Sequence, residues 1–573
     1  MHIFNQAQEP RIFSRQNLLV FLLLLTGLMG FVFWQLSHQY ASDLALLSWS
    51  KILTVFDAFE FRIENLSMLQ PHMPLYLLIP FYYLPGEYGY MAPYLTSAFC
   101  AAILLALWNH DLKIHRYTAG QRALLILLVA AHPFFLWSMS GSAVHGLTLL
   151  VFYLFCIATI RLTKYADARA FLMLGLVLAS FFFFDELAFF IFIAFFPMVQ
   201  LIVPRRMLDE SPMAVYLLVA VPLIVAVLTW LYLNDVFASN AYEFLENSRG
   251  TFRGSWLRAE NIDWLRLFGG KFITPALLAL GLILLAFPVS VWLVWRSRRH
   301  TKILAGIVIL LVNVALAVGF ASASSYLTHP IEILSLMVPG LMAVLILMPR
   351  EYKSFHRAAL YLMFVASIVG GWYAMHWKPT DEMRNWLAMW TTSEKLPPIS
   401  ATDEALGKWL KENPKVTLID DNVAYRAIVA RGNAKDLMVP FTKEFQLALR
   451  SENLTELNNL STLSSIGRAS SFKIEQVVVQ NPVYSRYVES LASPEVDMLT
   501  RRHPKLYEKG IVKTKEKVDS GSETKNATVT EKVNLKNSEP VAVELVYDDH
   551  VNWRVWRFKY NEELHRNVVQ CAP

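Results

Sequence analysis

Long apolar runs, separated by short basic stretches, are the feature that most constrains how this chain folds. A run of about 20 apolar residues crosses the hydrocarbon core as a helix, because all of its backbone amides are then satisfied within the segment. Only 17% of the 573 residues are charged, whereas soluble proteins carry about 25%. The pattern therefore predicts an α-helical polytopic membrane protein.

We predict about eleven membrane-spanning helices from these runs. They cover roughly residues 18–37, 91–109, 123–138, 143–161, 170–184, 187–203, 213–233, 273–295, 302–321, 333–348 and 357–376. The first run is longer than the apolar core of a signal peptide and lacks a small-x-small cleavage site, so we interpret it as a span. Residues 73–85 are apolar but short and interrupted by prolines, which favours an interfacial or re-entrant helix.

Basic residues predict how these spans are oriented. With the N-terminus inside, seventeen Lys and Arg residues fall in the cytoplasmic pieces and only seven in the opposite loops. This positive-inside bias, with an odd number of spans, places the C-terminal part outside the cytoplasm. We expect a multi-pass protein of the bacterial inner (plasma) membrane with a periplasmic C-terminal domain. Because the basic residues lie in short loops between spans, no nucleic-acid partner is expected.

The composition changes to a soluble type after residue 376. We predict a transmembrane domain over 1–376, with interfacial helices in 38–85, and an extracytoplasmic α/β domain over 377–573. Alternating strand and helix patterns indicate the α/β class. Residues 509–540 are rich in Lys, Glu, Ser, Thr and Asn and are predicted to be a low-complexity insertion. The last apolar segments are typical of a closing hairpin. Three scattered cysteines indicate no disulfide framework.

The first external loop, 38–72, carries the most chemistry-bearing residues. Asp43 follows the first span directly, where a carboxylate can act as a general base or hold a divalent ion such as Mg²⁺ or Mn²⁺. The alternative is that Ser42 or Asp43 caps a helix starting at Leu44. Further along, Asp57, Glu60 and Glu64 share one face of a helix over 55–66. Asp57 and Glu60 are candidate catalytic carboxylates, and the alternative is that all three form only the polar face of an amphipathic interfacial helix.

The layout from this loop onward resembles the GT-C class of polytopic glycosyltransferases. Asp43 is followed by Pro71-His72-Met73-Pro74-Leu75-Tyr76, then by Leu-Pro-Gly at 84–86 and a span. The stretches at 131–138 and 324–330 are similar to later segments of the family's polyprenyl-phosphate-sugar-dependent branch. That branch includes protein O-mannosyltransferases and lipid A aminoarabinose transferases. The resemblance implies a GT-C-like fold, a polyprenyl-phosphate-linked sugar donor and a catalytic or metal-binding Asp43.

The chain departs from that family at two positions. His145 lies where many members carry a second acid, so either His145 replaces it or the acid comes from elsewhere. A histidine at the end of a span is also a common packing residue. No lysine precedes the proline of the 71–76 motif, which argues against aminoarabinose as the donor sugar. Asp185-Glu186, between two apolar runs, indicates a polar break or a tight turn at the outer end of a span.

Cationic residues in the external loops are candidates for binding the carrier phosphate, because arginine pairs bidentately with phosphate oxygens. The alternative for these residues is contact with lipid headgroups. They are His72, Arg249, Arg253, Arg258 and His329.

The sequence therefore predicts a glycosyltransferase at the outer face of the membrane. It would move a monosaccharide from a polyprenyl-phosphate carrier to a protein, lipid or glycan acceptor. One alternative is a catalytically silent GT-C-like scaffold subunit of an envelope polysaccharide system. A transporter is a further alternative, and the lack of recognisable repeated halves argues against it.

Overall fold

The chain forms two compact units. The computed structural model describes residues 15–57, 73–83, 87–165, 167–185, 187–238, 241–242, 270–297, 303–322, 330–347, 354–376, 381–391, 401–440, 442, 445, 474–480, 499 and 543–558. The first unit comprises Met1–Ala45, Met68–Leu78 and Met91–Leu396, and the second Leu46–Ser67, Ile79–Tyr90 and Pro397–Pro573. The division differs from the sequence-based boundary at 376/377, because parts of the first external loop group with the C-terminal residues.

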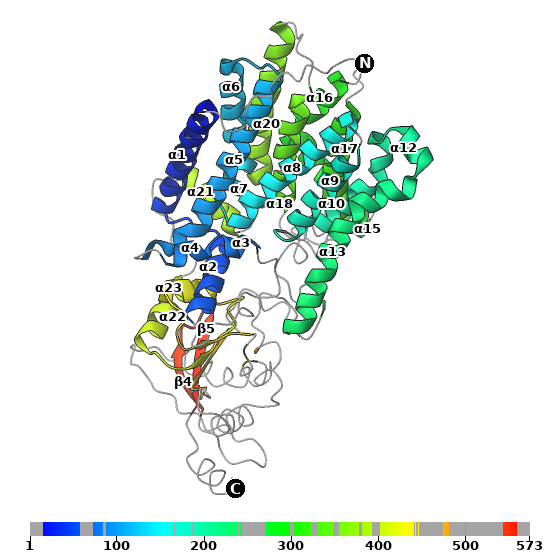
Figure 1. Ribbon diagram of the computed structural model, residues 1–573. Coiled ribbons are helices and arrows are strands. Elements are labelled where there is room, and N and C mark those ends of the chain that lie inside the picture. The colour runs from blue at the N-terminus through cyan, green and yellow to red at the C-terminus, as the bar shows by residue number, and fades with distance from the viewer. Residues whose placement is uncertain are drawn as a thin grey trace. The chain divides into compact units, whose positions relative to one another are not determined.

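The first unit is helical (Figure 1). It begins with α1 (Arg15–Ser37) and the first turn of α2 (Asp43–Phe56), followed by α3 (Met73–Tyr76) and α5 (Ala92–Ile114). The next helices are α6 (Ala119–Ala130), α7 (Pro133–Met139), α8 (Ala143–Tyr165), α9 (Ala168–Phe182), α10 (Leu187–Phe195), η3 (Phe196–Met198), α11 (Val199–Ile202), α12 (Arg205–Glu210) and α13 (Pro212–Ala238). The last are α15 (Gly270–Ala286), α16 (Pro288–Ser297), α17 (Ile303–Ser322), α18 (Pro330–Ser335), α19 (Met337–Ile346), α20 (Ser354–His376) and α21 (Asp381–Thr391).

Apolar helices cover each predicted span among the described residues. Five helices are long and apolar enough to cross a membrane, or seven if each of two bent pairs is one span. The four remaining predicted spans fall on shorter apolar helices within 168–182, 187–202, 304–319 and 333–346. The helical, membrane-spanning character is therefore confirmed, while the number eleven stays a prediction. Residues 73–82 form only two short helices, α3 and α4 (Ile79–Tyr82), rather than a long one.

Two of the predicted spans are broken rather than straight. The α6–α7 pair bends by 74° before Pro133, and the α15–α16 pair bends by 77° before Pro288. Proline lacks an N–H and disfavours helical geometry in the residue before it, so His132 is extended, with φ −71° and ψ 126°. The breaks pack together, because His132 stacks on Phe287 with ring centroids 4.8 Å apart. Its Nε2 lies 3.4 Å from the carbonyl oxygen of Ala286.

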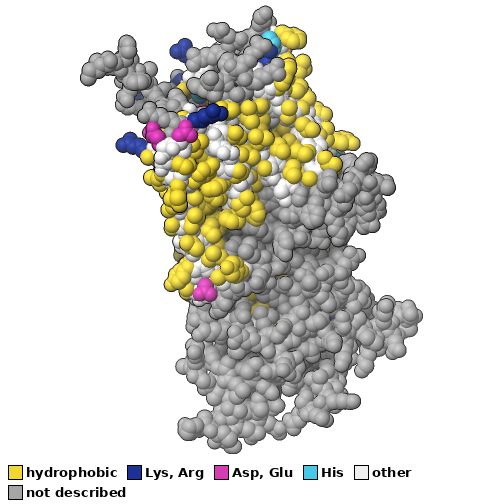
Figure 2. Space-filling model, turned by 90° about the vertical axis from the view of Figure 1, so that its right-hand side faces the viewer, with side chains coloured by type: hydrophobic (Ala, Val, Ile, Leu, Met, Phe, Trp, Pro, Cys, Tyr) yellow, Lys and Arg dark blue, Asp and Glu magenta, His cyan; other side chains and the backbone are white. Residues whose placement is uncertain are grey.

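The surface of the first unit matches a lipid environment. Figure 2 shows a face on which apolar side chains form a continuous area, with the charged side chains of the described residues gathered toward its ends. On α13, residues such as Leu217, Val221 and Leu228 are exposed. An apolar area of this extent is costly in water and is stable against lipid.

The second unit contains a five-stranded mixed sheet in the order β2-β1-β3-β5-β4. Its strands are β1 (Thr417–Leu418), β2 (Leu437–Met438), β3 (Gln476–Gln480), β4 (Val543–Asp548) and β5 (Trp553–Phe558). The strand β1 runs parallel to β2 and β3, while β5 is antiparallel to β3 and β4. Two helices, α22 (Ala401–Glu412) and α23 (Tyr425–Arg431), pack together beside it. A C-terminal α/β region with a closing hairpin is therefore confirmed, and the predicted insertion at 509–540 lies outside the described residues.

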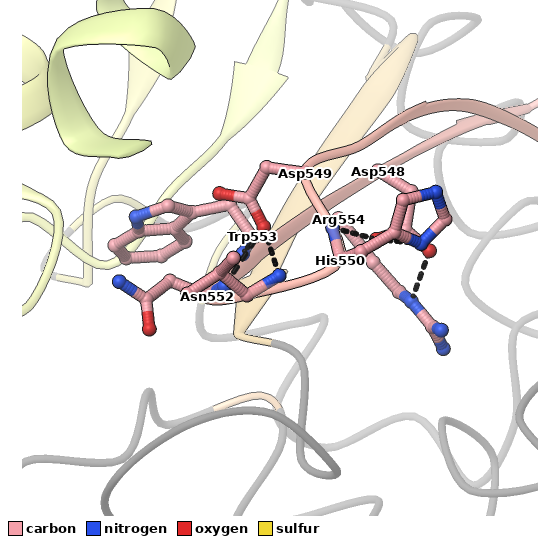
Figure 3. A network of polar contacts seen from close by, with 7 residues as sticks. Asp548, Asp549, His550, Asn552, Trp553 and Arg554 are labelled. Carbon is pink, nitrogen blue, oxygen red and sulfur yellow. Dashed lines mark hydrogen bonds and ion pairs between the residues drawn. The ribbon is translucent and has the colours of Figure 1, made fainter. Parts of the chain in front are cut away.

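Aspartates shape the turn of the closing hairpin (Figure 3). The Oδ1 atom of Asp549 accepts hydrogen bonds from the backbone N–H groups of Val551, Asn552 and Trp553, at 2.7 to 2.9 Å. Asp548 pairs with the buried Arg554, whose Nε lies 2.9 Å from its Oδ2. These bonds satisfy the turn's backbone donors locally, as aspartate does in Asx turns.

The body of α2 belongs to the second unit. The buried Lys51 places its Nζ 2.6 Å from Oδ2 of Asp421 and 2.9 Å from Oδ1 of Asn422. After the helix ends, Asp57 accepts hydrogen bonds from the hydroxyl of Tyr82 and, at 3.1 Å, from the backbone N–H of Ala434. The first external loop therefore contributes a helix to the packing of the C-terminal residues.

Candidate functional site

The candidate site lies in the first unit, where the chain leaves α1 and enters α2. The turn after α1 closes when the N–H groups of His38 and Gln39 donate to the carbonyls of Gln35 and Leu36, at 3.1 and 3.0 Å. Gln39 has a positive φ of 61°, which reverses the chain. Asp43 follows as the first residue of α2 and is half-buried. Its carboxylate therefore stands at a helix start that is still reachable from solvent.

A second carboxyl group meets Asp43 from a distant part of the chain. Glu382, in the first turn of α21, accepts hydrogen bonds at Oε1 from the backbone N–H of Asp43 (3.2 Å) and from the hydroxyl of Tyr40 (3.1 Å). The preceding N–H, of Ser42, donates to the hydroxyl oxygen of Tyr94 at 2.9 Å. The start of α2 is thus held by groups from both α21 and α5.

His145 completes the cluster from the start of α8. Its ring is buried and lies over Trp137, with centroids 4.7 Å apart. Space for the ring depends on Gly141, where a Cβ would come within 2.8 Å of the His145 Nδ1. His145 is near enough to Glu382 for its positive charge to favour the ionised carboxyl. An imidazole and two carboxyl groups are therefore gathered from three helices.

Electrostatics separates Glu382 from an ordinary surface carboxyl. The pKa of Glu382 is raised from 4.5 to about 7, first by burial and then by the negative charge of Asp43. Hydrogen bonds from Ser42 and Tyr40 and the charge of His145 oppose this rise. Burial also raises the pKa of Tyr40, as does the Glu382 charge. Carboxyl groups with perturbed pKa values that lie close together are typical of functional sites.

The arrangement can perform proton transfer at a hydroxyl group. The half-exposed carboxylate of Asp43 can accept a proton from a substrate hydroxyl. Because the pKa of Glu382 is about 7, its carboxyl group is partly protonated at neutral pH, which limits the total negative charge of the pair. The described residues contain no group of three or more His, Cys, Asp or Glu side chains arranged to hold a metal ion. Within that part of the chain, Asp43 is therefore not a member of such a three-residue set.

The structure brings together two of the predicted site residues, Asp43 and His145. Asp57 instead has its partners in the second unit, Tyr82 and Ala434. Asp185 accepts hydrogen bonds from Thr148 (3.0 Å) and from the N–H of Leu187 (2.9 Å), as expected of a tight turn before α10. The remaining predicted site residues lie outside the described residues. They are Glu60, Glu64, His72, Glu186, Arg249, Arg253, Arg258 and His329.

Glu382 is the residue that sequence reasoning missed. It lies shortly after the last predicted span, in a stretch with no motif, and its side chain meets Asp43 across 339 positions of sequence. The only available signal was the missing acid near His145, which left open that an acid could come from elsewhere. The residue that supplies this acid depends on how α21 packs, and no local sequence pattern predicts that packing.

Comparisons with known proteins find a likeness among solved structures. No protein-family model matches the sequence, and no curated protein matches it. The chain is similar to ArnT. That solved structure, of ArnT from Cupriavidus metallidurans bound to undecaprenyl phosphate, is 12% identical over 82% of this chain and 94% of the ArnT chain, with a TM-score of 0.49. A likeness at this level assigns no function, so the functional argument rests on the residues.

Proposed function

We propose that this chain is a membrane glycosyltransferase that moves a monosaccharide from a polyprenyl-phosphate carrier to an acceptor hydroxyl at the outer face of the bacterial inner membrane. The acceptor is a protein, lipid or glycan. The observation that carries the proposal is the half-exposed Asp43 beside Glu382 and His145 in an apolar helical unit. The resemblance of the first external loop to the polyprenyl-phosphate-sugar-dependent glycosyltransferases supports it.

We assign to Asp43 the role of general base for the acceptor hydroxyl. Its carboxylate takes the proton of the acceptor hydroxyl while the oxygen attacks the anomeric carbon. The bond from that carbon to the phosphate oxygen breaks, its electron pair stays on the phosphate, and the configuration inverts. The departing phosphate is already anionic, so cations rather than a strong acid assist it. We assign that role to His72, Arg249, Arg253, Arg258 and His329, on the sequence alone.

No step of this mechanism passes through a metal ion. Divalent cations need several oxygen or nitrogen ligands, and the described residues offer no set of three. Asp43 acts in the mechanism through proton transfer and through its orientation toward the acceptor oxygen.

The substitution Asp43→Asn tests the assignment. It removes the proton acceptor and keeps the size of the side chain. Proteoliposomes would be supplied with radiolabelled polyprenyl-phosphate monosaccharides and a membrane extract as the source of acceptors. General-base removal is expected to lower the rate of product formation by about a hundredfold to ten-thousandfold.

The control is Asp209→Asn, which changes an exposed aspartate of α12. We expect it to transfer sugar at the wild-type rate. Normal transfer by a folded Asp43→Asn protein would refute the role of Asp43.

A scaffold function is the second candidate. The hydrogen bonds from Asp43 and Ser42 to Glu382 and Tyr94 are also those that would cap a purely structural helix. If the chain is a scaffold, a strain that lacks it should make no envelope polysaccharide. Supplying the Asp43→Asn variant to that strain should then restore the polysaccharide fully. The same variant therefore separates the two functions.

A further inference from the structure

We propose that Glu382 is the positioning residue of Asp43, holding the start of α2 so that the Asp43 carboxylate is fixed toward the acceptor. The inference rests on the proposed function, since it concerns the same site. It also assigns Tyr94 as the second anchor. Neither residue is expected to touch the substrate for this role.

The anchoring contacts are made to consecutive backbone groups. Glu382 Oε1 accepts the N–H of Asp43 at 3.2 Å, and the Tyr94 hydroxyl oxygen accepts the N–H of Ser42 at 2.9 Å. The two N–H groups belong to the successive peptide planes 41–42 and 42–43, so both planes leading into Asp43 are held. The geometry of the reacting carboxylate is thus set by α21 and α5.

A third contact fixes Glu382 itself. The hydroxyl of Tyr40 donates to the same Oε1 atom at 3.1 Å, and Tyr40 is buried. The carboxyl oxygen that receives Asp43 therefore has its position defined by two donors. Tyr40 lies in the middle of the segment between α1 and α2, so Glu382 contacts both this segment and the first residue of α2.

The two N–H groups held here are ones that a capping side chain does not satisfy. The side chain of an N-cap residue accepts the N–H of the second or third helical residue, whereas Asp43 is the first residue of α2 and Ser42 precedes it. Here the acceptors come from residues 52 and 339 positions away. In addition, the carboxyl group of Glu382 lies beside that of Asp43, which is unfavourable when both are charged. Burial and the Asp43 charge accordingly raise the pKa of Glu382. Interactions that cost stability in this way are typical of active sites.

Within the part of the chain that the structure describes, three titratable side chains act on Glu382. Asp43 on α2, His145 on α8 and Tyr40 face it. On α20 and α21, His376 and Arg384 are exposed. The amide of glutamine could accept the same two hydrogen bonds without a charge, which makes Glu382→Gln the informative variant.

The experiment compares Glu382→Ala, Glu382→Gln and Tyr94→Phe in full-length protein, using the radiolabelled donor assay above. A misplacement of about 1 Å can slow a reaction by about a hundredfold, so Glu382→Ala should lower kcat by about that factor with little change in KM for the donor. Glu382→Gln should recover most of the loss, because its carbonyl oxygen accepts both bonds. The variant Tyr94→Phe should lower kcat in the same way.

The matched control is Tyr117→Phe. Like Tyr94, Tyr117 binds a backbone group in the first unit through its hydroxyl, which here donates to the carbonyl oxygen of Leu345 at 3.0 Å. Its loss should lower the melting temperature in detergent while leaving kcat unchanged. A purely structural role for Glu382 would give the same result as this control.

A double variant shows whether Glu382 acts through Asp43. In an Asp43→Asn background, Glu382→Ala should cause no further loss of kcat, because residues that act as a unit are not additive. Wild-type kcat in folded Glu382→Ala, or equal loss in Glu382→Ala and Glu382→Gln, would overturn the positioning role. If Glu382→Ala does not fold, the kcat values of Glu382→Gln and Tyr94→Phe test the positioning role in its place. Full transfer by Asp43→Asn would instead overturn the proposed function.

Discussion

Close helix packing at the residue level determines where His145 lies. The next residue, Gly146, faces α5, and a Cβ there would come within 2.7 Å of both Cα and the carbonyl oxygen of Ser97. These are backbone atoms, which cannot move aside without displacing a helix. Small residues allow such close approach between membrane helices. The α5–α8 contact beside the site therefore depends on a missing side chain.

We expect Gly146→Ala to destabilise the protein. Overpacking costs about 1–3 kcal/mol, so the melting temperature in detergent should fall and sugar transfer should decrease with it. The control is Gly27→Ala in α1, where a Cβ meets nothing within 4 Å, and alanine favours the helix by about 1 kcal/mol. Equal melting temperatures for the two variants would contradict the packing argument.

At the scale of elements, α2 is anchored by a buried ion pair as well as by hydrogen bonds. Lys51 and Asp421 are both almost fully buried within the second unit. Burial raises the pKa of Asp421, and the ammonium of Lys51 opposes that rise. Removing one partner of such a pair leaves the charge of the other buried and uncompensated.

Lys51→Met should lower the free energy of unfolding by about 3–5 kcal/mol. Without the ammonium, the pKa of Asp421 rises further, so the folded state binds a proton that the unfolded state releases at its ordinary pKa. Stability of the variant therefore decreases as the pH rises, and acidification should restore part of the loss.

Urea unfolding followed by tryptophan fluorescence at several pH values measures this effect. Lys408→Met is the control, because Lys408 forms an exposed pair with Glu404 at 2.8 Å within α22. Exposed pairs contribute little, so its midpoint should match the wild type. A Lys51→Met midpoint that is insensitive to pH would argue against a buried, unpaired Asp421.

At the scale of the whole molecule, the orientation in the membrane remains a prediction from charge. Alkaline phosphatase fused after Ala238 or after Pro573 should be active, because the enzyme folds outside the cytoplasm. Fusion after Ser297, in a predicted cytoplasmic loop, should be inactive. Activity at Ser297 with none at Ala238 would invert the topology and remove the proposed site from the outer face.

Sequence by itself determined the helical membrane character and the C-terminal α/β region with its hairpin. These follow from local physics, since a helix of about 20 apolar residues satisfies its own backbone in lipid, and alternating patterns define strands. The two breaks were not predicted, and only the structure shows the bends of 74° and 77°. Asp43 was found as a candidate because it follows the first predicted span, and His145 because it lies where the resembling glycosyltransferases carry a second acid.

Tertiary structure alone decided that Glu382 meets Asp43, that Asp57 binds within the second unit, and that α2 is shared between the two units. The physical reason is that these contacts join residues hundreds of positions apart, where no hydrophobic period or capping pattern specifies a partner. Hydrogen-bond donors at the start of α2 needed acceptors, and no local pattern specifies which residues supply them. Packing of α21 against the neighbouring helices selected Glu382 instead.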